Sequence, residues 1–278
     1  MKDIKRRIKS IGSTRQITKA MELVSSSKLR KAKQRAELAR PYFNELYKSM
    51  CEIASANTDF STVFTEKREI KHRLFIVIAG DRGLAGGYNS NVMKLAAAAH
   101  ADDAEKPKII AVGKKAIEYF SKRGYDIVGS YFNIAESIKP AQAQDIADTA
   151  VEMFRRGEVD DVQIFYTLFV SQLTQEPQQM AVLPMKTQKL DNYGVMDYDP
   201  SPEAVFNRIV PKFTASLVQC AVVESYASEQ GARRTAMESA TDNADAMTES
   251  LSLLYNRARQ ASITQEITEI VSGANALD

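Results

Sequence analysis

The sequence predicts an α/β plus coiled-coil fold, in which a small doubly wound α/β domain is inserted between the two helices of an antiparallel coiled coil. Apolar residues recur at alternating steps of three and four near both ends of the chain, and short apolar runs alternate with helical segments between them. The first pattern indicates helices that pack on each other, and the second indicates a sheet covered by helices. We therefore predict a coiled-coil helix over residues 1–57, an α/β domain over residues 58–204 and a second coiled-coil helix over residues 205–278.

The first helix is predicted over Lys2 to Ala56. Its apolar stripe is clearest at Leu29, Ala32, Ala36, Ala39, Phe43, Leu46, Met50 and Ile53. Pro41 interrupts the pattern, and a proline inside a helix loses one hydrogen bond and clashes with the preceding turn, which costs about 3 kcal/mol. We therefore expect a kink at Pro41 or two abutting helices. The polar segment Asn57 to Lys71 is typical of a linker.

The central region alternates predicted strands with predicted helices. The strands are expected at Arg73 to Gly80, Pro107 to Gly113, Tyr125 to Ser130 and Asp161 to Val170, and the helices at Asn91 to His100, Lys114 to Arg123 and Gln142 to Arg156. Met180 to Met185 is predicted as an edge strand, because Pro177 and Pro184 flank it and proline is poorly tolerated in a central strand. This alternation predicts the doubly wound sheet.

The last helix carries the second heptad stripe. Its members are Met237, Ala240, Ala244, Met247, Leu251, Leu254, Ala258 and Ala261, followed in a shifted phase by Ile263, Ile267 and Ile270. Pro211 is expected in its first turns, where proline costs least, and Gly273 is expected to end it. Because no segment between the two ends carries another uninterrupted heptad stripe, the first and last helices are predicted to pair. A helix of about 55 residues is roughly 80 Å long, more than the core of a small domain needs, which favours a mechanical or adaptor protein over a compact enzyme.

Charge is distributed unevenly along the chain. The formal net charge is +2, but residues 1–40 contain thirteen Lys or Arg and three acidic residues, which leaves 24 basic and 32 acidic residues elsewhere. Such a cationic helix could bind nucleic acid, anionic lipid or an acidic protein surface, and charge alone does not separate these partners. The basic face formed by Lys28, Arg30, Lys31, Lys33 and Arg35 lacks the interleaved aromatic residues that stack on bases, so we predict no nucleic-acid partner.

No motif in the sequence predicts catalysis. The glycine loop at Gly80, Gly83, Gly86 and Gly87 follows a strand, but its spacing fits neither a dinucleotide-binding fingerprint nor a Walker A loop, so we interpret it as a tight turn or a subunit-contact loop. The two histidines, His72 and His100, are expected on the solvated surface. Cys51 and Cys220 lack the spacing of a metal site. We therefore expect no catalytic residue, no cofactor and no bound metal.

Three sequence blocks resemble the gamma subunit family of F-type ATP synthases. They are IKRRIKSIGSTRQITKAMELVSSSKLRKA near the start, DRGLAGGYNSN in the middle and RRTAMESATDNADAMTESLSLLYNRARQASITQEITEIVSGA at the end, in the order of that family. The resemblance implies a non-catalytic rotor shaft, present in one copy per complex, inside a catalytic hexamer of alpha and beta subunits. It further implies contacts of the α/β domain with the epsilon subunit and with the membrane c-ring. Rotation would couple proton or sodium-ion flow to ATP synthesis or hydrolysis.

The same resemblance implies subunit-contact residues and a location. Met21 and Arg233 would lie near the lower part of the hexamer, and Tyr198 and Asp199 would contact the membrane ring. The polar contacts near the upper bearing would be made by Arg259, Gln260 and Thr264. The chain would be a peripheral membrane protein on the cytoplasmic face of a bacterial inner membrane, or on the matrix face of a mitochondrial one. It has no cysteine between residues 52 and 219, so the thiol control of chloroplast relatives is not expected.

Two other functions remain compatible with the residue patterns alone. One is a nucleotide-dependent enzyme with a coiled-coil arm that reaches along RNA, which would require a phosphate-binding loop. The other is a coiled-coil adaptor unrelated to energy conversion, which would not require the block at residues 233–273. Binding of labelled ATP to the chain distinguishes the first of these from the other two functions.

Overall fold

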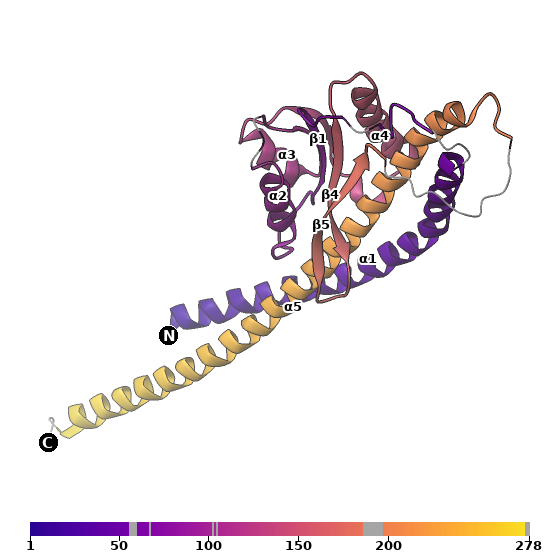
Figure 1. Cartoon of the computed structure of the whole chain (residues 1–278). Helices are drawn as coiled ribbons and strands as arrows, with labels where there is room; N and C mark the ends of the chain where they lie inside the picture. Colours follow the sequence, from indigo (N-terminus) through magenta and orange to yellow (C-terminus); the bar gives the residue numbers. More distant parts are fainter. Residues whose placement is uncertain (56–59, 67, 102, 104, 186–196, 276–278) are drawn as a thin grey trace. The chain divides into compact units, whose positions relative to one another are not determined.

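The structure is a computed structural model that describes residues 1–278 except 56–59, 67, 102, 104, 186–196 and 276–278 (Figure 1). Two compact units make up the chain. The helical-pair unit contains Met1–Ser25 and Arg234–Asp278, and the sheet unit contains Ser26–Arg233. Both long helices cross this division, α1 over Lys2–Ser55 and α5 over Pro202–Asn275. The predicted domain boundaries at residues 57 and 204 instead divide the long helices from the α/β segment between them, and they stay a prediction.

The sheet unit has five strands in the order β3-β2-β1-β4-β5. The strands are β1 (Arg73–Ile78), β2 (Lys108–Val112), β3 (Ile127–Tyr131), β4 (Asp161–Phe169) and β5 (Gln175–Leu183), and the shorter helices are α2 (Tyr88–Ala98), α3 (Lys114–Ser121), the 3₁₀ turn η1 (Ala135–Ser137) and α4 (Pro140–Arg155). The first four strands pair in parallel, and β5 adds an antiparallel edge to β4. The chain moves outward from β1 in both directions, which confirms the doubly wound prediction.

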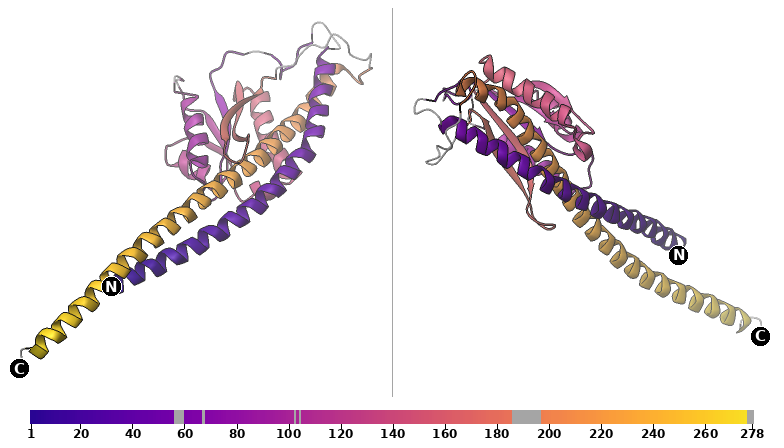
Figure 2. Two further views of the ribbon diagram at one scale, coloured as in Figure 1. Left: turned by 90° about the horizontal axis from the view of Figure 1, so that it is seen from below. Right: turned by 90° about the vertical axis from the view of Figure 1, so that its right-hand side faces the viewer.

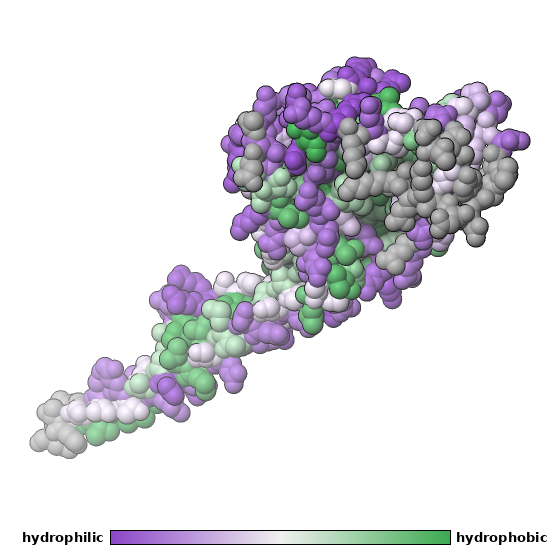
Figure 3. Space-filling view, viewed as in Figure 1, coloured by the Kyte–Doolittle hydropathy of each residue, from purple (hydrophilic) through white to green (hydrophobic). Residues whose placement is uncertain are grey.

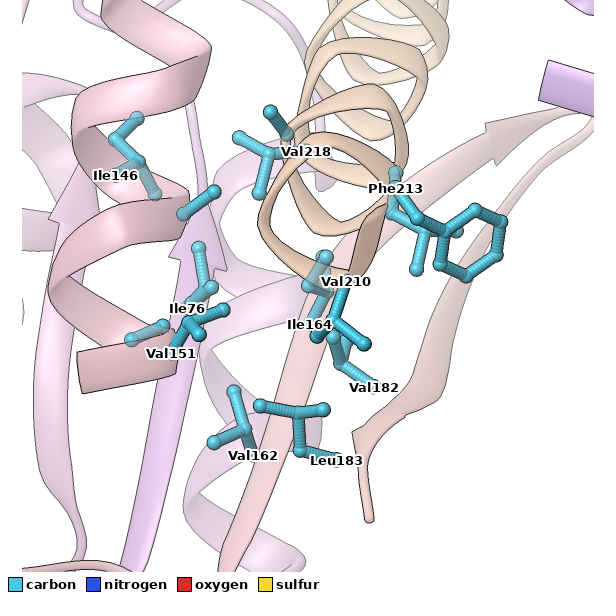
Figure 4. Packing of buried hydrophobic residues seen from close by; sticks show 14 of the residues in the cluster. Ile76, Ile146, Val151, Val162, Ile164, Val182, Leu183, Val210, Phe213 and Val218 are labelled. Atoms are coloured by element: carbon cyan, nitrogen blue, oxygen red, sulfur yellow. The ribbon is translucent and has the colours of Figure 1, made fainter. Parts of the chain in front are cut away.

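Alternate residues of β1 fill two different cores. Phe75 and Val77 belong to a cluster shared with α2 and α3, whereas Leu74, Ile76 and Ile78 belong to a larger cluster with α4. The first turns of α5 pack in this second cluster, and Figure 4 shows side chains of β1, α4, β4 and α5 meeting there. A strand buried on both faces is typical of a central parallel strand, since helices cover both sides of the sheet. The beginning of α5 is therefore one of the covering helices of the sheet.

Within each unit, α1 and α5 pair in antiparallel order. In the sheet unit, Leu29 and Ala32 pack against Tyr226 and Ala227, while Phe43 stacks on Phe213 with ring centroids 5.6 Å apart. Residues further along α1 thus meet residues earlier in α5, and the two views of Figure 2 show these helices side by side. This arrangement confirms the predicted coiled-coil pairing.

The same order holds in the helical-pair unit. The buried hydroxyl oxygens of Thr18 and Thr241 lie 2.7 Å apart, and the Arg15 guanidinium pairs with the Asp245 carboxylate. Met237 and Ala244 are the members of the predicted stripe on α5 that are buried in this unit. Beyond them, the described members of the stripe are partly or fully exposed, so α1 covers only the first part of this stripe.

Two predicted helix ends are wrong. Helix α1 runs through Pro41 as one helix, so it is not two abutting helices, and α5 continues past Gly273 to Asn275. Helix α5 begins at Pro202, three residues before the expected start, so Pro211 lies about one turn further inside the helix than expected. Local residue preference is a weak guide to a helix end when the flanking turns are packed, and both prolines are flanked by residues of the main core, Phe43 and Phe213 among them.

The linker, the edge strand and one histidine also differ from expectation. Phe64 is buried in the main core and Phe60 packs against it, so the segment between α1 and β1 is partly a core element. Strand β5 begins at Gln175 and contains Pro177, which an edge strand tolerates because one side of its backbone lacks a neighbouring strand. His100 is half-buried, and its Nε2 lies 2.7 Å from the Tyr125 hydroxyl, whereas His72 is exposed as expected.

Candidate functional site

The glycine loop after β1 is fastened to α5 by Arg233. The Arg233 guanidinium donates to the Gly83 carbonyl oxygen at 3.2 Å and to the Glu229 carboxylate at 2.5 Å. The loop is also tied to itself, because the Gly80 N–H donates to the Asn89 side-chain oxygen at 2.8 Å. The Asn89 amide in turn donates to the Arg82 carbonyl oxygen at 3.1 Å. The loop is therefore part of the packing between the sheet and α5.

Asp81 of the glycine loop accepts hydrogen bonds from two backbone amides, one of them at the N-terminus of α3. Its carboxylate accepts a hydrogen bond from the Lys114 N–H at the start of α3 at 3.0 Å, and another from the Asn133 N–H at 2.9 Å. The N-terminus of a helix attracts an anion, and here the chain supplies that anion itself. Gly113, which precedes α3, has φ +97°, and a Cβ there would lie 2.1 Å from the Ala79 carbonyl oxygen. The geometry favours the interpretation of the loop as a structural turn.

The Glu229–Arg233 pair is buried in the sheet unit. The two residues are 5% and 8% exposed, and their partners were not visible in the sequence because the loop lies far away in the chain. Burial raises the pKa of Glu229, while the Arg233 charge opposes that rise. Burial also raises the pKa of the adjacent Tyr88 well above its ordinary value, with a further contribution from Glu229. Arg233 was predicted as a subunit contact; the structure places it in this internal pair, and the contact stays a prediction.

The predicted upper-bearing residues lie on the exposed surface of α5. Arg259, Gln260 and Thr264 are all exposed, and the Thr264 hydroxyl donates to the Gln260 carbonyl oxygen one turn earlier at 3.0 Å. Met21 of α1, also predicted as a contact, is half-buried in the same helical-pair unit. All four residues remain predictions as contacts.

The end of α5 carries exposed apolar side chains beside these polar residues. Figure 3 shows apolar surface along this part of the chain. The exposed apolar tip is formed by Ile263, Ile267, Ile270 and Val271, which are 45%, 56%, 71% and 52% exposed. Within the described part of the chain, none of these four side chains belongs to a hydrophobic core. Contiguous exposed apolar residues of this kind mark surfaces that bind a partner.

Tyr198 and Asp199, the predicted ring contacts, precede α5. Tyr198 is half-buried against the main core, and burial raises its pKa, with a smaller contribution from the Glu52 charge. Asp199 is exposed. Residues 186–196, which precede them in the chain, lie outside the described residues.

Three of the five residues in the basic face of α1 make contacts inside the sheet unit. The Lys28 ammonium donates to the Glu136 carboxylate at 2.8 Å, and the Arg35 guanidinium donates to the Glu136 carbonyl oxygen. The Lys33 ammonium lies 4.4 Å from the centroid of the Phe169 ring. The acidic partner of this face is thus partly the η1 turn of the same chain, which sequence spacing could not reveal.

Within the described residues, no group of three or more His, Cys, Asp or Glu side chains is arranged to hold a metal ion. No helix in the part of the chain that the structure describes is long and apolar enough to cross a membrane.

Comparison with known proteins decides the family. Residues 1–277 match the ATP synthase family. The chain is 52% identical to the ATP synthase gamma chain of Ruminococcus albus over 99% of its own length and 97% of the relative's. The chain belongs to the ATP synthase gamma chain family. It is also 44% identical to the sodium ion specific ATP synthase gamma chain of Acetobacterium woodii, over 100% of its own length and 99% of the relative's.

Solved structures of ATP synthases share the fold of this gamma chain family member. The chain is similar to a chain of the Tetrahymena thermophila mitochondrial ATP synthase central stalk and c-ring, with TM-score 0.64, 25% identity and coverage of 81% of this chain and 99% of that chain. A chain from the Euglena gracilis mitochondrial ATP synthase has TM-score 0.71 at 20% identity, with coverage of 99% and 94%. The family assignment makes the chain a non-catalytic central-stalk subunit of a rotary ATP synthase.

Proposed function

We propose that the chain is the turning shaft through which ion flow at a membrane ring drives conformational cycling of catalytic alpha and beta subunits. One copy would serve each complex. The exposed apolar tip of α5 carries this proposal, because Ile263, Ile267, Ile270 and Val271 expose apolar surface at the end of a long helix. Burial of such surface by a surrounding sleeve of subunits would stabilise the complex by about 25 cal/mol per Å².

The polar residues beside the tip would supply contacts that change during rotation. Arg259, Gln260 and Thr264 are exposed and clustered within two turns of α5. A ligand or partner shifts a conformational equilibrium only through contacts that differ between the states. Rotation of a helix with an uneven distribution of charged and apolar groups would present each catalytic subunit with a different set of contacts. Met21 and Arg233 are proposed to act lower on the shaft in the same way.

The continuity of α5 supports a mechanical role. The helix begins as a covering helix of the sheet and continues without a break past Arg233, where the division between the two units falls. The Glu229–Arg233 pair fastens it to the glycine loop. A hydrogen-bonded helix anchored in this way resists twisting at its base, as a shaft requires.

The sheet unit is proposed to bind the epsilon subunit and the membrane c-ring. Exposed Asp199 and half-buried Tyr198 are the proposed ring contacts. The chain would then be peripheral to the membrane, on the cytoplasmic face of a bacterial inner membrane or on the matrix face of a mitochondrial one. The coupling ion would be a proton or a sodium ion, since a relative at 44% identity is described as sodium ion specific.

Reconstitution tests this proposal. The chain is mixed with alpha and beta subunits from the same source, and ATP hydrolysis by the isolated complex is compared with and without the chain. We expect one copy per complex and chain-dependent hydrolysis, which a combined Arg259→Ala and Gln260→Ala variant lowers. Lys122→Ala, an exposed residue just after α3, is the matched control and leaves hydrolysis unchanged. A folded chain that stays unbound would refute the shaft assignment and favour a coiled-coil adaptor.

A further inference from the structure

A cavity of about 430 Å³ lies in the sheet unit between α1, the η1 turn and α5. Its lining comes from three segments that are distant in the sequence: Ala32, Arg35 and Leu38 of α1, residues 135–138, and Gln219, Val223 and Tyr226 of α5. Pockets that bind small molecules have volumes of about 300–1,000 Å³, with mostly apolar walls and a few polar groups. This cavity has that size and that composition.

Tyr226 brings an unused hydrogen-bonding group to the cavity. The residue is 8% exposed, and its ring packs with Leu29 and Ala32. Among the described residues, its buried hydroxyl oxygen makes no hydrogen bond of ordinary geometry. The hydroxyl faces the Glu136 carboxylate, and a weak hydrogen bond from Tyr226 is the smallest contribution to the lowering of the pKa of that carboxyl group. A buried hydroxyl that lacks a well-aligned partner destabilises the fold, so a bound acceptor would stabilise the site.

The charges at the cavity favour an anion. Glu136 is already paired with the Lys28 ammonium at 2.8 Å, and that hydrogen bond is the main cause of its lowered pKa. The Arg35 guanidinium donates to the Glu136 carbonyl oxygen, which uses one of its five N–H donors. The Arg35 guanidinium, the Tyr226 hydroxyl and the Gln219 amide line the same cavity and can donate hydrogen bonds to an acceptor placed there. Counting Lys28, Arg35 and Glu136, the lining and its partners carry one net positive charge.

We infer that this cavity binds a small organic monoanion with an apolar body. The carboxylate accepts hydrogen bonds from Arg35 and Tyr226, and the apolar body packs against Leu38, Ile138 and Val223. Leu38 is 80% exposed, so a ligand would also cover apolar surface that now faces solvent. Because the lining joins α1, the η1 turn and α5, a bound ligand holds these three segments together and raises the stability of the sheet unit.

A small molecule fits these observations better than a side chain of a partner protein. The lining comes from three segments and combines a few polar side chains with apolar ones, which is the composition of a ligand pocket. A partner's acidic side chain is the competing occupant. The two occupants differ in one respect: a partner's side chain would block the cavity in the assembled complex, whereas a free ligand would still bind.

Ligand-observed NMR and calorimetry on the full chain test the inference with 2-naphthoate as the probe. Its neutral analogue 2-naphthalenemethanol and its cationic analogue 2-naphthylmethylamine have the same ring system. We expect 2-naphthoate to bind more tightly than the neutral analogue by about tenfold, as a charge-assisted hydrogen bond provides, and the cation to bind most weakly. Equal binding of the three probes, or preference for the cation, would overturn the assignment to an anion.

Variants locate the binding. Arg35→Gln is expected to weaken 2-naphthoate binding about tenfold and Tyr226→Phe severalfold, whereas Lys31→Gln, an exposed cation on α1 outside the lining, leaves it unchanged. Ala135→Leu fills the cavity without removing a polar contact, so it abolishes binding while the chain keeps its circular dichroism spectrum and melting temperature. Binding that survives Ala135→Leu and Tyr226→Phe overturns the proposed site. Binding to the free chain that is lost in the reconstituted alpha–beta complex assigns the cavity to a partner's side chain and overturns the small-molecule inference.

Discussion

Substitution of Arg233 tests the buried pair that fastens α5 to the glycine loop. Arg233→Met keeps the length and the apolar stem of the side chain but removes the charge beside Glu229 and the hydrogen bond to the Gly83 carbonyl oxygen. Removal of one partner of a buried ion pair costs about 3–5 kcal/mol, because the other charge is left uncompensated. The two side chains are 10% and 7% exposed, so we expect the lower end, about 3 kcal/mol at pH 7.

The stability that Arg233→Met loses depends on pH, and the burial of Glu229 determines the direction of that dependence. Burial raises the pKa of Glu229 in the folded chain, and the loss of the Arg233 charge removes the main opposing effect. A group with a raised folded-state pKa contributes stability that is present below its unfolded pKa and is lost as the pH rises through its folded pKa. Each pH unit in that window is about 1.4 kcal/mol. Arg233→Met is therefore expected to recover part of its lost stability as the pH falls below 7 and Glu229 takes up a proton.

The assay is urea unfolding of the full chain, followed by circular dichroism at pH 7 and pH 5. Arg259→Met, an exposed arginine on the same helix, is the matched control and should change stability by less than about 0.5 kcal/mol. A double variant with Glu229→Gln and Arg233→Met removes both charges and should be more stable than Arg233→Met at pH 7. Additive effects of the two substitutions, or a loss below about 1 kcal/mol at pH 7 for Arg233→Met, would refute the reasoning.

Three further measurements test other parts of the structure. Gly113→Ala places a Cβ 2.1 Å from the Ala79 carbonyl oxygen at a residue with φ +97°. The control is Gly157→Ala, at a residue with φ +73° and no atom within 4 Å of the added Cβ, which should lower the free energy of unfolding by roughly 1 kcal/mol. Gly113→Ala should lower it by well over that amount, and equal urea midpoints for the two variants would contradict this. Thr18→Val removes the buried hydroxyl contact to Thr241 and should lower the stability measured by thermal unfolding by about 1 kcal/mol. Unchanged stability would contradict the antiparallel pairing at this point. Burial and the Asp145 carboxylate raise the pKa of Tyr131 to about 12 from 10.0. The stability that this phenol contributes should therefore be lost as the pH rises from about 10 to 12, and Tyr131→Phe should lack that loss in pH-dependent unfolding.

Element type was predictable wherever burial imposes a repeated pattern. The apolar runs at β1, β2 and β4 are buried on both faces, and the stripes of α1 and α5 follow the period of a helix, so their positions follow from residue spacing alone. Element ends were less predictable. Pro41, Pro211 and Gly273 are local signals for a break, but the helices pass through all three because cooperative hydrogen bonding and tertiary packing outweigh a cost of a few kcal/mol at one position.

The family and its contact residues came from ordered sequence blocks, and the full-length relatives confirm the family. The sequence by itself determined that two long helices pair in antiparallel order around an inserted doubly wound domain, because that conclusion depends only on periodicity and chain order. Only the tertiary structure decided which charges are used internally. Arg233 meets Glu229 and the glycine loop, Asp81 caps the start of α3, and Glu136 binds Lys28. These partners are separated along the chain, and a side chain's surroundings are set by the folding of the whole sheet unit rather than by its neighbours in sequence.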